Sequence, residues 1–185
     1  MSVTSKQPSL DSRLRGNDEG KALPRTPFAV AAALAWVLLL AYFFANVEIQ
    51  IEGAAGWAAG LPTWRVEKHW LLDIFWGGRP LTGYHAWVFP CVALFFHFPL
   101  LFMGHFSWRA EMRVIACIQI FWIVEDFLWF ALNPAFGLAK FRPESVPWHI
   151  HWFGPAPVDY WTFLGLAFVL LALSCLPFRE SGAGE

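Results

Sequence analysis

Two adjacent carboxylates, Glu125 and Asp126, lie in the middle of an apolar stretch, residues 114–132, that is long enough to cross a membrane. A carboxylate at bilayer depth is energetically costly, and such groups are usually functional or paired inside a helix bundle. Because burial and like charge both disfavour ionising two neighbouring carboxyl groups, we expect this pair to share a proton. One group can then donate a proton while the other accepts one, as general acid/base catalysis requires. The sequence therefore predicts Glu125 and Asp126 as a catalytic acid/base pair.

Polar and tryptophan side chains repeat at helical spacing through the same stretch and form one stripe: Gln119, Trp122, Asp126, Trp129 and Asn133. The stripe is expected to face the inside of a bundle, because lipid offers no hydrogen-bond partner to an amide or a carboxylate. Tryptophan rings suit an apolar substrate or a cation formed during a reaction. We therefore predict that the substrate-binding residues are Trp122, Trp129, Gln119 and Asn133. The alternative interpretation is a hydrogen-bonded seam that only fixes helix packing.

His97 is a third candidate for proton transfer, because it lies within a second apolar stretch, residues 85–103. At a rise of about 1.5 Å per residue, His97 and Asp126 are about 18 Å and about 12 Å from the ends of their stretches that adjoin the longer loops. The two side chains could then share one level of the membrane. We predict His97 as a catalytic proton relay; the alternative is a histidine that only completes core hydrogen bonds.

Two further histidines, His149 and His151, flank Ile150 in a loop and point the same way if that segment is extended. Imidazoles in this arrangement can hold a metal when further ligands converge on it. The sequence therefore offers His149 and His151 as candidate metal ligands. The alternative is that they belong, with Trp148 and Trp152, to an aromatic belt at the membrane surface.

These candidates must be positioned by membrane helices, because 57% of the 185 residues are hydrophobic, above the share usual in soluble domains. Four segments are long and apolar enough to span the hydrocarbon, which takes about 20 residues of helix. They are residues 28–47, 85–103, 114–132 and 160–176. The predicted fold is an all-α polytopic membrane protein, a bundle of four transmembrane helices within residues 27–178.

The two long loops, residues 48–84 and 133–159, are too apolar to be simple connectors. The pattern of residues 62–76 predicts an amphipathic helix lying at the membrane interface. Prolines restrict the second loop, which is therefore expected to be ordered. Eight of the twelve tryptophans lie in these loops or at adjoining span ends: Trp57, Trp64, Trp70, Trp76, Trp87, Trp148, Trp152 and Trp161. Together the loops predict an ordered, aromatic-rich outer cap.

Positive charge predicts the orientation of the spans. Lysine and arginine concentrate before the first span, in the short link between the second and third spans, and after the last span. Because such residues stay on the cytoplasmic side, we expect cytoplasmic tails at 1–26 and 179–185 and outward-facing long loops. The polar, glycine-containing composition of the first tail predicts that it is disordered. The sequence has no basic stripe and no stacking-module motif, so we expect no nucleic-acid partner.

The segment Ser9 to Asp18, SLDSRLRGND, resembles the peptide encoded when a short dispersed intergenic repeat of proteobacterial genomes is read through as coding sequence. This resemblance implies a bacterial source, and therefore a multi-pass protein of the bacterial inner membrane. It implies nothing about function.

Three functions remain open from the sequence, and enzymatic activity is uncertain. The leading hypothesis is a buried carboxylate and tryptophan site near the outer leaflet that binds, or transforms by acid/base chemistry, a lipid-like or isoprenoid-like molecule, with membrane lipids as partners. The second is a non-enzymatic accessory or assembly subunit with a membrane or periplasmic protein partner. The third is proton or metal-ion passage. No cofactor is predicted, because phosphate-loop, dinucleotide and HExxH motifs are missing and the three cysteines lack paired spacing.

Overall fold

The computed structural model describes residues 27–104 and 106–176, except the side chains of Ile74 and Phe75. The two predicted tails, 1–26 and 179–185, lie outside the described residues. Within the described residues, four helices are long and apolar enough to cross a membrane, as predicted. They are α2 (Pro27–Glu52), α4 (Gly83–His97) continued by the 3-10 helix η2 (Phe98–Met103), α5 (Trp108–Leu132) and α6 (Val158–Cys175).

Local sequence signals set the ends of these helices. Gly53, with a φ of 62°, follows α2 in the left-handed conformation that closes many helices, and its N–H donates to the Ile49 carbonyl. The Ser107 side chain caps the start of α5 by accepting from the Ala110 N–H. The other end of α5 comes at Leu132, before Asn133-Pro134, because the residue before a proline disfavours the helical region.

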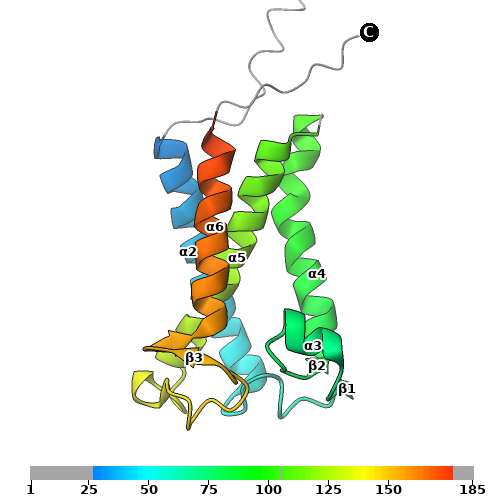
Figure 1. Cartoon of the computed structure of the whole chain (residues 1–185), viewed down its shortest axis with the longest axis vertical. Coiled ribbons are helices and arrows are strands. Elements are labelled where there is room, and N and C mark those ends of the chain that lie inside the picture. The colour runs from blue at the N-terminus through cyan, green and yellow to red at the C-terminus, as the bar shows by residue number, and fades with distance from the viewer. Residues whose placement is uncertain (1–26, 105, 177–185) are drawn as a thin grey trace, which may run out of the picture.

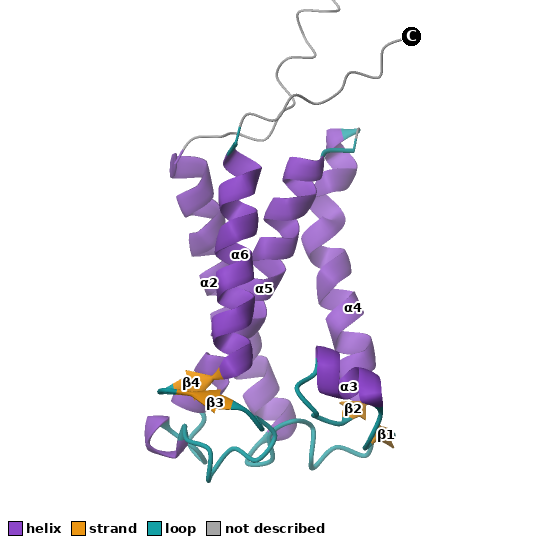
Figure 2. Cartoon of the chain, in the orientation of Figure 1, coloured by secondary structure: helices purple, strands orange, loops and turns teal. Residues whose placement is uncertain are grey.

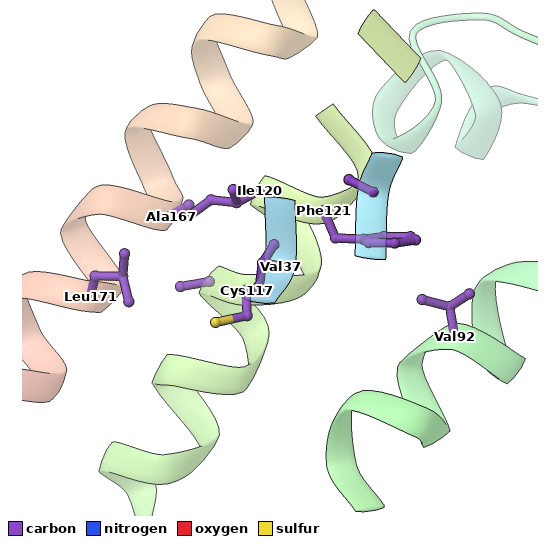
Figure 3. Packing of buried hydrophobic residues seen from close by; sticks show 9 residues of the cluster. Val37, Val92, Cys117, Ile120, Phe121, Ala167 and Leu171 are labelled. Atoms are coloured by element: carbon purple, nitrogen blue, oxygen red, sulfur yellow. The ribbon is translucent and has the colours of Figure 1, made fainter. Parts of the chain in front are cut away.

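Helix α5 is the centre of the bundle, with α2 and α6 packed along it (Figure 1). Helix α4 adjoins α5 at the end where the two are linked and leans away from it towards the other end (Figure 1). Figure 3 shows the packing in the middle of the bundle, where side chains of α2, α4 and α6 lie around those of α5. The buried residues of this cluster are Val37, Ala41, Val92, Ala116, Cys117, Ile120, Phe121, Ala167 and Leu171.

The opposite end of the bundle is covered by a cap, which we define as residues 53–82 and 133–157 (Figure 2). The first segment contains β1 (Arg65–Val66), α3 (Trp70–Phe75) and β2 (Leu81–Thr82), with β1 and β2 antiparallel. The second contains η3 (Leu138–Lys140) and the antiparallel pair β3 (Trp152–Phe153) and β4 (Ala156–Pro157). The start of α2 and the end of α6 lie at the far end of the bundle from the cap (Figure 1).

The predicted helix over 62–76 is shorter than expected. Arg65 instead pairs with Thr82 in the β1–β2 ladder, and its guanidinium donates to the Ala58 carbonyl. His69 is extended at a φ of −159° and caps α3 by accepting from the Leu71 N–H, so the helix begins only at Trp70. Long-range pairing therefore overrides the helical pattern in the first part of this segment.

An aromatic cluster fixes the second cap segment to the end of α5. Ile49, Trp129, Phe130 and Val146 are buried together, and Phe130 is fully enclosed. The Trp148 ring stacks on Phe130 with centroids 5.9 Å apart and planes at 13°. This packing brings the cap over the end of the helices and places its tryptophans above the half of the bundle that holds Glu125 and Asp126.

Candidate functional site

A cavity of about 360 Å³ lies beneath the cap, bounded by α2, α4, α5 and α6. Aromatic side chains form much of its wall: Trp57, Trp76, Phe89, Trp122, Trp129, Trp148, Tyr160 and Phe163. Five carboxylates also line it: Glu48, Glu52, Glu125, Asp126 and Asp159. Along α5 the lining runs from Trp129 to Ile118, and the hydrophobic cluster of Figure 3 packs the middle of the bundle, from Phe121 to Ala116 of α5.

Asp126 is held by two hydrogen bonds from different parts of the chain. Its Oδ2 accepts from the Tyr160 hydroxyl of α6 at 2.5 Å and lies 3.0 Å from Nε2 of His149 in the cap. Charged hydrogen bonds of this kind are among the stronger polar contacts in proteins. Asp126 therefore joins α5, α6 and the cap at the cavity wall.

His149 continues this chain of polar groups towards the first cap segment. Its side chain is only 1% exposed, and its Nδ1 lies 3.5 Å from Oδ2 of Asp159. Burial by itself would lower the pKa of His149, as would the nearby Arg79 charge, but the Asp126 and Asp159 carboxylates outweigh both and raise it. Arg79 donates to the same Asp159 oxygen at 2.5 Å. Protonated His149 can thus donate to one aspartate from each ring nitrogen.

A second polar group, centred on Glu125, lies about 100° around α5 from Asp126 and involves Glu48 of α2. The carboxyl groups of Glu48 and Glu125 are close enough to share a hydrogen bond, and the Tyr84 hydroxyl donates to Oε1 of Glu48 at 2.7 Å. Because an ionised carboxylate only accepts, a bond between two carboxyl groups requires one proton on the pair. Oε1 of Glu125 is buried with no hydrogen-bond partner among the described residues.

Trp57 forms the cap side of the cavity in an unusual backbone conformation. Trp57 and Ala58 have φ angles of 54° and 53°, a region that costs energy for side chains other than glycine. Hydrogen bonds hold the turn: the Ala58 N–H donates to Glu52 at 2.5 Å, and the Trp57 indole donates to the Pro80 carbonyl at 2.8 Å. The Trp57 ring then stacks on His85, with centroids 4.0 Å apart.

The structure brings most of the predicted site residues to this cavity. Glu125, Asp126, Gln119, Trp122 and Trp129 all line it. Yet Glu125 and Asp126 belong to different polar groups, because the closest carboxyl partner of Glu125 lies on α2 and the Asp126 carboxylate is paired with His149 and Tyr160. The predicted pairing of the two neighbours is therefore replaced by two separate partnerships.

Asn133 and His97 lie apart from the cavity. The Asn133 amide donates to the Gly53 carbonyl at 2.7 Å and its Oδ1 accepts from the Ala135 N–H at 2.9 Å, so it joins the ends of α2 and α5. His97 is bonded to Glu111 at 2.9 Å. Glu111 precedes Asp126 by about 22 Å of helix, so His97 and Asp126 do not share one level of the membrane.

The two histidines considered as metal ligands have different surroundings. His149 is buried between Asp126 and Asp159, whereas His151 is exposed. Among residues 27–104 and 106–176, no group of three His, Cys, Asp or Glu side chains is placed to hold a metal ion. A metal at this position stays a prediction from the sequence.

Several residues of the cavity and its polar groups were not identified as site residues from the sequence: Glu48, Glu52, Arg79, Tyr84 and Tyr160. One signal was available for two of them. Ala41, Ala45, Glu48 and Glu52 recur at spacings of three and four, and so continue one face of the first helix past its predicted end at Val47. The others come together only through the tertiary fold.

Comparisons with protein-family models, curated proteins and solved structures find no match to this chain.

Proposed function

We propose that the cavity binds a lipid-like or isoprenoid-like molecule and that its carboxyl groups act on that molecule as an acid/base system. The observation that carries this proposal is a carboxyl oxygen of Glu125 that is buried at the wall of an aromatic cavity and has no hydrogen-bond partner among the described residues. The volume of about 360 Å³ is within the range of small-molecule sites. Large apolar walls with a few converging polar groups are typical of such sites.

Glu125 and Glu48 are the proposed acid/base pair. One proton shared between them leaves one group able to donate and the other able to accept, and the Tyr84 hydroxyl holds Glu48 in place. Asp126 is the positioning residue in this scheme, because its Oδ2 is already bonded by Tyr160 and His149. His97 has no part in it.

The proposed route for the ligand is from the membrane. Phe163 of α6 lines the cavity and is 37% exposed, so the rim of the cavity reaches the lipid-facing surface of the bundle there. The distribution of Lys and Arg supports cytoplasmic termini in a bacterial inner membrane. With that orientation the cap faces outward and the cavity lies within the outer leaflet.

The two alternative functions draw less support from the geometry. A docking surface for a partner helix needs an outward-facing polar stripe, whereas Glu125 and Trp129 are buried and line the cavity. Ion passage needs a polar path through the bundle, whereas the cluster of Figure 3 packs the middle of the bundle with apolar side chains.

Native mass spectrometry on gently extracted protein tests the proposal, by comparing wild type with the Glu125→Gln variant and the Glu125→Gln, Asp126→Asn double variant. Glu111→Gln is the matched control, since Glu111 is on the same helix but outside the cavity. We expect a stoichiometric apolar small molecule on wild type and on the control, and its loss from both cavity variants.

Thermal unfolding and gel filtration of each variant establish that the folded bundle is being compared. A wild-type mass without any apolar ligand after extraction in several mild detergents contradicts the proposal. A co-purifying protein that is lost in the variants supports an accessory subunit instead.

A further inference from the structure

The charges around the cavity are compensated on one side of α5 and uncompensated on the other. Asp126 and Asp159 are paired with His149 and Arg79. Glu48, Glu52 and Glu125 have no salt-bridge partner among residues 27–104 and 106–176. A buried carboxylate without a cation is costly, so this side of the cavity favours a positively charged occupant.

Unpartnered polar atoms at the same wall indicate which chemical groups that occupant carries. Oε1 of Glu125 and Oε1 of Gln119 are buried acceptors without a donor among the described residues. Glu125 is only 2% exposed, so a donor must come from within the cavity. Gln119 lies about 9 Å deeper along α5. The indole N–H of Trp129, whose side chain is buried, is unpartnered as well and would donate to an oxygen on the same ligand.

The aromatic walls distinguish an organic cation from a metal ion. The faces of tryptophan rings attract ammonium groups, and the attraction strengthens where water is excluded. Trp122 and Trp129 supply such rings beside Glu125, whereas the Trp57 ring is already in contact with His85 and the Arg79 guanidinium. A hard metal ion instead needs several converging oxygen ligands, and no group of three ligating side chains is placed for one among the described residues.

We propose that the cavity selects amphiphiles that carry a protonated amine, with an ammonium N–H donated to Oε1 of Glu125. One proton shared by Glu48 and Glu125 would leave this pair a single negative charge, which matches one ammonium. The apolar body of the ligand packs against the Phe89 and Trp122 rings, which contact each other, and leaves past Phe163. This inference rests on the proposed function and adds to it the charge of the ligand.

Three ligands with the same dodecyl chain differ in charge and in N–H donation: dodecylamine, dodecyltrimethylammonium and dodecanol. Their binding is measured by isothermal titration calorimetry on the full chain in phosphatidylcholine nanodiscs, with empty nanodiscs subtracted. We expect wild type to bind dodecylamine about tenfold or more tightly than dodecanol, since a charged hydrogen bond in a dry site is worth at least that ratio. Dodecyltrimethylammonium should lie between them, because it has the charge but no N–H.

The variant Glu125→Gln should lower the affinity for dodecylamine about tenfold and that for dodecanol less than about twofold, while Glu111→Gln changes neither. If Glu125→Gln does not fold, Glu48→Gln carries the same expectation. Equal affinities of wild type for dodecylamine and dodecanol, or an amine affinity that Glu125→Gln leaves unchanged, overturn the cation preference but keep the apolar site. Failure of all three ligands to bind overturns the proposed function together with the inference.

Discussion

Nε2 of His149 in the cap lies 3.0 Å from Oδ2 of Asp126 on α5, so a single imidazole ties the second cap segment to a carboxylate inside the bundle. The other ring nitrogen faces Asp159, which receives the Arg79 guanidinium from the first cap segment. The two halves of the cap are therefore joined through one buried chain of charges. Closure of the cavity depends on this chain, because Arg79, Asp126 and Asp159 are themselves parts of its wall.

The protonation of His149 should make cap stability depend on pH. The folded pKa is raised above the usual value of about 6.5, so the proton is bound more tightly in the folded state. Its contribution is fully present below about pH 6.5 and is lost as the pH rises through the folded pKa. We expect the melting temperature of wild type to exceed that of His149→Gln by most at low pH, with the difference shrinking as the pH increases.

Differential scanning fluorimetry between pH 5.5 and pH 9 measures that difference. The other groups near His149, namely Arg79, Asp126, Asp159 and Tyr160, are present in both proteins, so the two proteins differ in the imidazole and in the effect of its loss on these groups. A difference that stays constant or grows with pH would show that His149 is neutral in the folded protein.

Removing the Asp126 charge should be more damaging than removing its hydroxyl partner. Asp126→Asn leaves buried His149 short of one of its two carboxylates, and breaking a buried ion pair typically costs about 3–5 kcal/mol. Tyr160→Phe deletes one hydrogen bond to a charged group, for about 1.5–3 kcal/mol. Unfolding in mixed micelles gives both values. The Asp126→Asn, His149→Gln double variant should lose less than the sum of the single variants, because the pair acts as a unit.

Gly56 should not tolerate a side chain. A Cβ at Gly56 would lie 2.3 Å and 2.6 Å from two ring carbons of Trp148 and 3.1 Å from one of Trp129. The alanine in Gly56→Ala therefore has to displace the Trp148 and Trp129 rings, which line the cavity. Overpacking of this kind lowers the stability of the folded protein by about 1–3 kcal/mol. We expect a lower melting temperature and weaker retention of the cavity ligand in native mass spectrometry.

Gly165→Ala is the control for that substitution. Gly165 lies within α6, and a Cβ there meets nothing within 4 Å. The alanine should be neutral or stabilising by up to about 1 kcal/mol through helix propensity. Equal effects of the two substitutions would mean that Trp148 and Trp129 yield freely, and would weaken the description of the cavity as a preformed site.

The helices could be predicted from composition, because apolar length alone identifies a membrane span, and the stop at Asn133-Pro134 follows from backbone sterics. Gln119, Trp122, Glu125, Asp126 and Trp129 were identified because they break the apolar pattern of one helix. Such residues can be found from the sequence because the polar or tryptophan position and the apolar pattern it interrupts lie in the same segment.

The partners of Glu125 and Asp126 could not be predicted, because they depend on which helix faces which. By its sequence Glu48 falls in a loop and Tyr160 is the first residue of a span, so the sequence marks neither as a partner of a carboxylate. The depth estimate for His97 failed for a related reason. It measured distance along each helix from its cap end, whereas α4 leans away from α5 there and His97 contacts Glu111 near the link instead.

Asn133 provides a test of whether the polar stripe is functional along its whole length. Both polar atoms of its amide are hydrogen-bonded to backbone groups, Nδ2 to the Gly53 carbonyl and Oδ1 to the Ala135 N–H, and the residue is 3% exposed. Asn133→Ala leaves those buried groups unpaired, so we expect a loss of stability of about 1–3 kcal/mol. Ligand affinity should stay unchanged in the folded fraction. The control is Asn46→Ala, because the Asn46 amide donates to the Tyr42 carbonyl on an exposed helix face and its loss should cost less than about 0.5 kcal/mol. Weaker ligand binding by a fully stable Asn133→Ala variant would instead return Asn133 to the substrate-binding role predicted from the sequence.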